Sequence, residues 1–121
     1  LRVREPFRVE RESPPAVLLG PATASSAEIL AVAFHSRPAT RSFGAPTRGL
    51  LAGNRIFTLA DGASLVLTVA ATSDGGGRVY AGPVVPDQAV AGGGQPSRAE
   101  EAADETLAAA VAWLAAGDSC R

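Results

Sequence analysis

Residues 16–35 read AVLLGPATASSAEILAVAFH, and this stretch decides the fold. Residues 16–19 are a short apolar run that a Gly-Pro pair ends, which is typical of a buried β-strand. Ser25, with Glu28 three residues later, matches the capping box that begins a helix. The apolar residues after it predict a largely buried helix of about three turns. A strand, a tight turn and a helix in this order favour an α/β fold.

Further along the chain, a second strand and a hairpin are expected. Residues 40–43 are predicted to form a short strand, and the Gly-rich residues 44–54 a loop. Asp61-Gly62 separates the runs 55–60 and 63–71, which is a strong signal for a β-hairpin. The second run is almost continuously apolar, so both of its faces are expected to be covered.

The last part of the chain changes composition abruptly. Residues 72–96 are rich in Gly and Pro and are predicted to be mostly irregular. Ser97 and Glu100 repeat the capping box, and Gly117 is a helix terminator, so a C-terminal helix is expected between them. Its buried stripe is expected to contain a repeating apolar set on one face. That set consists of Leu107, Ala110, Val111 and Leu114.

Composition excludes several classes of protein. The 121 residues are 46% hydrophobic and 19% charged, which is unlike a disordered chain. Eleven basic and twelve acidic residues give a net charge of −1, so no basic surface is available for nucleic acid. No segment approaches the roughly 20 apolar residues that cross a bilayer. One Cys and one His exclude a disulfide framework and a His-rich metal centre, and we expect no metal and no cofactor.

Ser25 is the best candidate for chemistry. A serine at a sharp junction of strand and helix lies beside the free N–H groups of the first helical turn, and the N–H of Ser26 would be one oxyanion donor. The alternative is that Ser25 is only an N-cap whose oxygen accepts from those N–H groups. N-cap serines are far commoner than nucleophilic ones, so the local pattern alone favours the cap.

The chain offers Ser25 no local base. His35 lies ten residues further along the same predicted helix, which places it about 15 Å away, whereas a base must approach to about 3 Å. Asp61, Asp74 and Asp87 are expected to be turn or solvated residues. The chain contains no Lys at all.

Several blocks together resemble the tail-specific (C-terminal processing) serine peptidases. The blocks follow the family's order and are GPATASSAE at 20–28, RPATRSFGAPT at 37–47, GLLAGN at 49–54, LADGA at 59–63, and GRVY with VPD at 77–80 and 85–87. The resemblance covers roughly residues 16–115.

The resemblance implies a serine peptidase in which Ser25 is the nucleophile and Ser26 supplies an oxyanion N–H. The best-known branch of the family uses a lysine 25 residues after the serine, but Leu50 stands there. The chain is therefore more similar to the lysine-lacking branch that resembles the tricorn core protease and retinoid-binding homologues, and its general base would come from outside this segment. Residues 1–15 would be an extended arm or linker. Residues 16–121 would be the C-terminal part of the peptidase domain, a partial Clp protease/crotonase-like β–α spiral with a C-terminal helix.

The same resemblance implies the partners. They are a polypeptide substrate and the remainder of the peptidase domain, or a partner chain, without which this segment would be inactive. It also suggests a periplasmic or extracellular location. The alternative is a non-catalytic ligand-binding or scaffold homologue in which Ser25 is only a helix N-cap.

Overall fold

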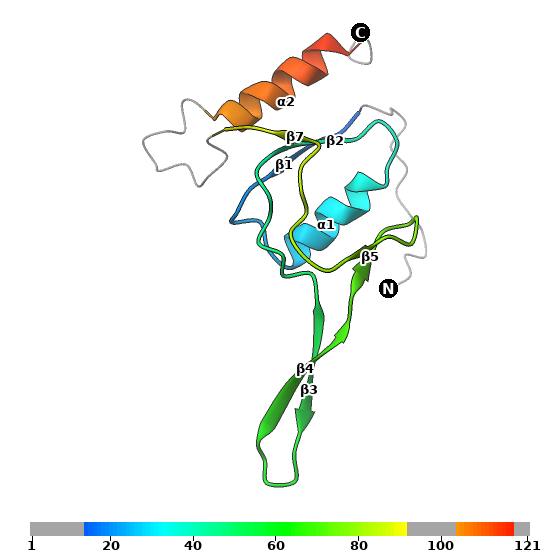
Figure 1. Cartoon of the computed structure of the whole chain (residues 1–121), viewed down its shortest axis with the longest axis vertical. Coiled ribbons are helices and arrows are strands. Elements are labelled where there is room, and N and C mark those ends of the chain that lie inside the picture. Colours follow the sequence, from blue (N-terminus) through cyan, green and yellow to red (C-terminus); the bar gives the residue numbers. More distant parts are fainter. Residues whose placement is uncertain (1–13, 92–103, 118–121) are drawn as a thin grey trace, which may run out of the picture.

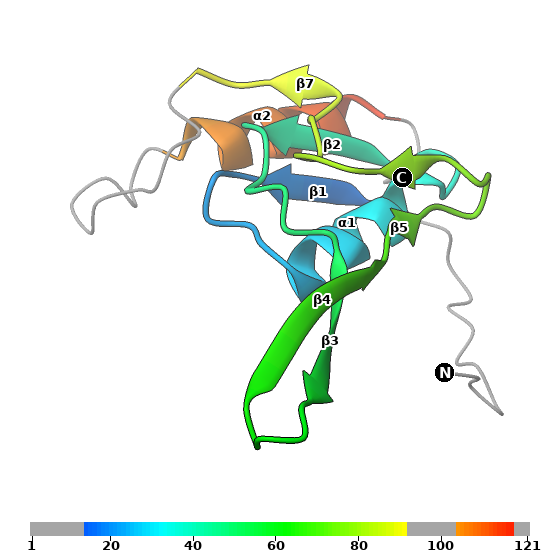
Figure 2. The same cartoon turned by 60° about the horizontal axis from the view of Figure 1, so that its bottom comes forward.

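The computed structural model describes residues 14–91 and 104–117, and its centre is a small parallel sheet. Strands β1 (Ala16–Leu19), β2 (Arg41–Gly44) and β7 (Gln88–Ala89) lie in the order β1-β2-β7, and both pairs are parallel. Helix α1 (Ser26–His35) connects β1 to β2 on one face, and helix α2 (Glu105–Ala116) covers the other (Figures 1 and 2). The α/β class predicted from the first strand and helix is confirmed.

The core lies mainly between α1 and the sheet. Its buried members come from β1, α1, the segment just before the hairpin, and the chain between the hairpin and β7. They are Leu19, Ala31, Val32, Leu51, Tyr80 and Val84. Gly44 allows close packing of the sheet, because a Cβ there would lie 2.1 Å from the carbonyl oxygen of Leu19 and its φ is +119°.

The predicted hairpin is present, with β3 (Gly53–Thr58) paired antiparallel to β4 (Ser64–Ala70). Strand β3 begins inside the predicted loop, and the connection spans residues 59–63, where the Leu59 N–H donates to the Ala63 carbonyl over 2.8 Å. The expectation that both faces of the second strand are covered is wrong for the described residues. Every position of both strands is exposed, because the hairpin projects away from the sheet (Figure 1).

The expectation of irregular structure after the hairpin needs correction. Within the described part of that segment, β5 (Thr72–Ser73) pairs with β6 (Val79–Tyr80), and β7 joins β2. Each of these strands has only two residues, which is too short to leave a periodic pattern in the sequence. Pairing with a partner strand, rather than local preference, decides that they are extended.

Helix α2 begins later than predicted, at Glu105. Its N-cap is Asp104. The backbone of Asp104 is extended, so the helix begins at the next residue, and its carboxylate accepts from the N–H groups of Thr106 and Leu107. The proposed capping residues Ser97 and Glu100 lie outside the described residues, as does most of the predicted arm 1–15. The C-cap is Gly117, as predicted.

The buried stripe of α2 also differs from the prediction. Thr106 and Ala110 are buried, whereas Leu107 and Val111 are about half exposed. Trp113 packs against Phe43 of β2 with ring centroids 5.7 Å apart. The helix therefore rests on the sheet through small residues and one aromatic ring, a choice of face that depends on the sheet beneath it. Neither α1 nor α2, the helices that the structure describes, is long and apolar enough to cross a membrane.

Candidate functional site around Ser25

Ser25 stands at the turn between β1 and α1, in a strained backbone conformation. Its φ of 55° and ψ of −119° fall in a region that L-residues rarely adopt. The turn before it is closed by the Thr23 N–H, which donates to the Gly20 carbonyl over 2.9 Å. Ser25 is exposed. A strained serine at the top of a strand-to-helix turn is the arrangement by which hydrolases present a nucleophilic oxygen.

The side chain of Ser25 makes no capping hydrogen bond to the helix. The predicted capping-box arrangement of Ser25 and Glu28 is nevertheless present, and in it the Glu28 carboxylate accepts from the Ser25 N–H over 2.8 Å. The first helical residue, Ser26, has no backbone acceptor for its N–H among the residues that the structure describes. The Ser26 N–H is therefore available to a ligand, as the first N–H of a helix is, and the exposed Ser25 hydroxyl stands next to it in the chain.

Glu28 is completely buried, with 0% of its surface exposed, and four neutral donors surround its carboxylate. Oε2 accepts from the N–H groups of Ser25 and Leu50, each over 2.8 Å. Oε1 accepts from the Thr47 hydroxyl over 2.5 Å and from the Gly49 N–H over 2.6 Å. One side chain thus joins the turn at Ser25 to the segment 47–50.

The electrostatics of Glu28 follow from these contacts. Burial, the largest single influence, would raise the pKa of its carboxyl group. The hydrogen bonds from Thr47, Gly49, Ser25 and Leu50 together outweigh burial and hold the pKa below 4.5. Glu28 is therefore ionised at neutral pH, and no basic side chain among residues 14–91 and 104–117 pairs with it.

The backbone of segment 47–50 follows a path that requires glycine. Gly49 has a φ of +83°, and a Cβ at this position would lie 2.9 Å from the ring of Pro83. Thr47 is buried, and its hydroxyl also accepts from the Val84 N–H over 2.8 Å. Leu50, where the family resemblance places a lysine, lies beside the turn at Ser25, because its N–H and that of Ser25 share one carboxylate oxygen.

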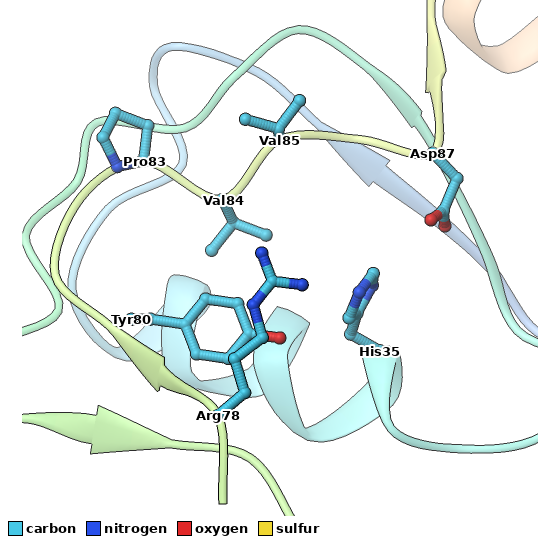
Figure 3. A pocket seen from close by; sticks show the side chains of 7 residues that line it. All are labelled: His35, Arg78, Tyr80, Pro83, Val84, Val85 and Asp87. Carbon is cyan, nitrogen blue, oxygen red and sulfur yellow. The ribbon is translucent and has the colours of Figure 1, made fainter. Parts of the chain in front are cut away.

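His35 is the last residue of α1, at the end opposite Ser25, so the rejection of His35 as the base is consistent with the fold. It lines a shallow pocket of about 240 Å³ between the end of α1 and the chain from β6 to β7 (Figure 3). The remaining lining residues are Arg78, Tyr80, Pro83, Val84, Val85 and Asp87. Ser25 and Ser26 are not among them, so the pocket is separate from the turn at Ser25.

The three aspartates that were expected to be structural make hydrogen bonds within the fold. Asp87 accepts from the N–H and the hydroxyl of Ser42, over 2.8 and 2.7 Å, which ties the start of β7 to β2. Asp74 accepts from the hydroxyl of Tyr80 and from two turn amides. Asp61 accepts from an amide of the hairpin turn. Over residues 14–91 and 104–117, no three His, Cys, Asp or Glu side chains gather as metal ligands.

Sequence reasoning missed the role of two residues. Glu28 was considered only as the partner in a capping box, and Thr47 was not singled out. The spacing of three residues between Ser25 and Glu28 indicates one of the four hydrogen bonds of Glu28, the one from the Ser25 N–H. The other three come from residues 19 to 22 positions away, and no local pattern indicates them.

Comparison with known proteins adds two findings. The family model described as peptidase family S41 matches residues 4–90. A solved structure of a lipoprotein from Streptococcus agalactiae is similar to this chain, with a TM-score of 0.64 and 34% sequence identity. The similarity covers 84% of this chain but only 31% of that one. None of the curated proteins matches this sequence significantly.

Proposed function

Because the chain belongs to peptidase family S41, the tail-specific peptidases, we propose that it carries the nucleophile of a serine peptidase and that this nucleophile is Ser25. The observation that carries the proposal is the strained turn, on which the exposed Ser25 makes no capping bond to the helix that follows. A residue that only caps a helix has no reason to keep a costly backbone conformation and leave the cap unmade.

The chemistry would proceed through an acyl-enzyme. The hydroxyl oxygen of Ser25 attacks the carbonyl carbon of a peptide bond while a base removes its proton, and the N–H of Ser26 donates to the developing oxyanion. The tetrahedral intermediate collapses, the amine takes the proton and leaves, and an ester remains on Ser25. Water then attacks this ester and releases the new carboxylate.

Part of this machinery would come from outside the chain. The segment spans 31% of the similar lipoprotein structure, so the intact protein has room for a general base and a second oxyanion donor elsewhere. We propose that residues 16–121 are the C-terminal part of a Clp protease/crotonase-like domain and that residues 1–15 lead into it. By itself the segment would supply no general base for Ser25 and would not hydrolyse a substrate.

The exposed hairpin supports this division. Apolar side chains of β3 and β4 that are 37–67% exposed include Ile56, Phe57, Val66 and Val69. An apolar two-stranded ribbon is marginally stable in water and is normally covered by other structure. We therefore propose that the remainder of the peptidase domain, or a partner chain, packs against β3 and β4, and that the substrate is a polypeptide.

A second candidate is a non-catalytic binding homologue, which the leucine at position 50 favours because it removes the lysine of the best-known branch. A fluorophosphonate probe applied to the intact protein distinguishes the two. Mass spectrometry should locate the adduct on Ser25, and Ser25→Ala should abolish it. Absence of labelling in a folded protein would refute the peptidase proposal and favour the binding homologue.

A further inference from the structure

Glu28 binds the backbone amide of Ser25, which is next to that of Ser26 in the turn between β1 and α1. Its Oε2 accepts the Ser25 N–H over 2.8 Å, so this donor points into the protein and away from any substrate. The Ser26 N–H keeps no backbone acceptor within the described ranges. The carboxylate therefore occupies the Ser25 N–H and leaves the neighbouring Ser26 N–H without an acceptor among the described residues.

The same carboxylate holds the strained turn against the segment 47–50. The Ser25 and Leu50 nitrogens are each 2.8 Å from Oε2, so they are separated by at most twice that distance. Thr47 and Gly49 bind the other oxygen, and Gly49 follows a backbone path that a larger residue could not adopt. A backbone held at φ 55° tends to relax to a commoner conformation unless its surroundings fix it.

Glu28 is not placed to act as a base itself. Its carboxylate is fully buried and already accepts four hydrogen bonds, which fills the acceptor positions of both oxygens. No cation pairs with it in the part of the chain that the structure describes, so its charge is balanced by oriented dipoles alone. It has neither the exposure nor a free acceptor site to receive the Ser25 proton or to contact a substrate.

We propose that Glu28 is a positioning residue of the active site, which sets the conformation of Ser25 and the direction of the Ser26 N–H while anchoring segment 47–50 beside them. This inference rests on the proposed peptidase function. In Glu28→Gln, an NH₂ group replaces one carboxylate oxygen. This NH₂ is a donor and would face the two donors that the oxygen now accepts from, so the turn must shift to separate them. A misplacement of about 1 Å at a reacting centre lowers a rate by about 100-fold.

The test uses the intact protein and measures the rate of fluorophosphonate labelling at Ser25 together with the thermal midpoint. Glu28→Gln should label about 100-fold more slowly than the wild type. Thr47→Val, which removes one donor while keeping the shape, should also label more slowly, and Thr47→Ser should restore the wild-type rate. Once a cleavable peptide is known, the loss should lie in kcat with KM unchanged, because Glu28 does not contact the substrate.

Asp87→Asn is the matched control. Asp87 also joins two segments through a carboxylate that accepts from two donors of Ser42, but it is exposed and lines the pocket with His35, at the end of α1 opposite Ser25. It should lose stability and still label at the wild-type rate. Wild-type labelling rates in folded Glu28→Gln would overturn the inference, and if that variant does not fold, equal rates in Thr47→Val and Thr47→Ser would do so. Absence of labelling in the wild type would instead refute the peptidase function, and this inference with it.

Discussion

Substitutions of Ser25 separate a helix cap from a nucleophile by their effect on stability. Replacing Ser25 by Ala removes only the hydroxyl, which makes no capping bond to the helix. An exposed substitution of this kind changes the free energy of unfolding by less than about 0.5 kcal/mol. If the hydroxyl capped the helix, the same change would cost about 1 kcal/mol, within a range of roughly 0.5–2.

Ser25→Gly should stabilise the protein. A side chain held at φ 55° costs of the order of 1–3 kcal/mol, and glycine adopts this conformation without that strain. Glycine in turn loses about 0.5–1 kcal/mol through the greater freedom of its unfolded chain. The net expectation is a gain of about 1 kcal/mol, whereas a capping serine replaced by glycine would lose a few tenths.

Urea denaturation of the intact protein, followed by circular dichroism, resolves these outcomes. A change of about 1 kcal/mol moves the midpoint by roughly 0.3–1 M at the slopes usual for small domains. The expected order of midpoints is Ser25→Gly above the wild type, with Ser25→Ala equal to it. A Ser25→Ala midpoint lower by the full capping value would refute the reasoning, because it would show that the hydroxyl supports the helix.

Three further predictions concern other parts of the structure. Gly44→Ala should destabilise the protein by about 3 kcal/mol or more, because the added Cβ meets the Leu19 carbonyl in a backbone conformation unsuited to alanine; a wild-type urea midpoint would contradict this. The folded-state pKa of Glu28 lies below the unfolded value of 4.5, so its contribution is complete above that pH and is lost as the pH falls through the folded value. The urea midpoint of the wild type should therefore fall as the pH is lowered, and it should fall less in Glu28→Gln. An equal dependence of the two midpoints on pH would contradict this prediction. If other structure covers the hairpin, Ile56→Lys in the intact protein should lower the free energy of unfolding by about 2 kcal/mol or more. An unchanged urea midpoint would show that β3 stays exposed.

Local patterns were sufficient for the elements around the nucleophile. The apolar run 16–19, the Gly-Pro turn and the helix that ends at His35 are where the sequence placed them, and so is the hairpin around Asp61-Gly62. These features depend on neighbours within a few residues, since turn chemistry and helix signals act over that range. The start of α2 and its buried face were predicted wrongly, because Asp104, which the sequence analysis does not single out, is the N-cap and the sheet below the helix selects the face.

The sequence by itself determined that a serine stands between a strand and a helix, and that neither a lysine nor a nearby histidine accompanies it. Only the tertiary structure decided what that serine does with its hydrogen bonds. Glu28 meets donors from segment 47–50 because β1 and β2 lie side by side, which brings together residues about twenty positions apart. A cap and a nucleophile share one local sequence pattern, including the bond from the Ser25 N–H to Glu28, and the structure adds the long-range contacts that fix Glu28 and the strained backbone at Ser25.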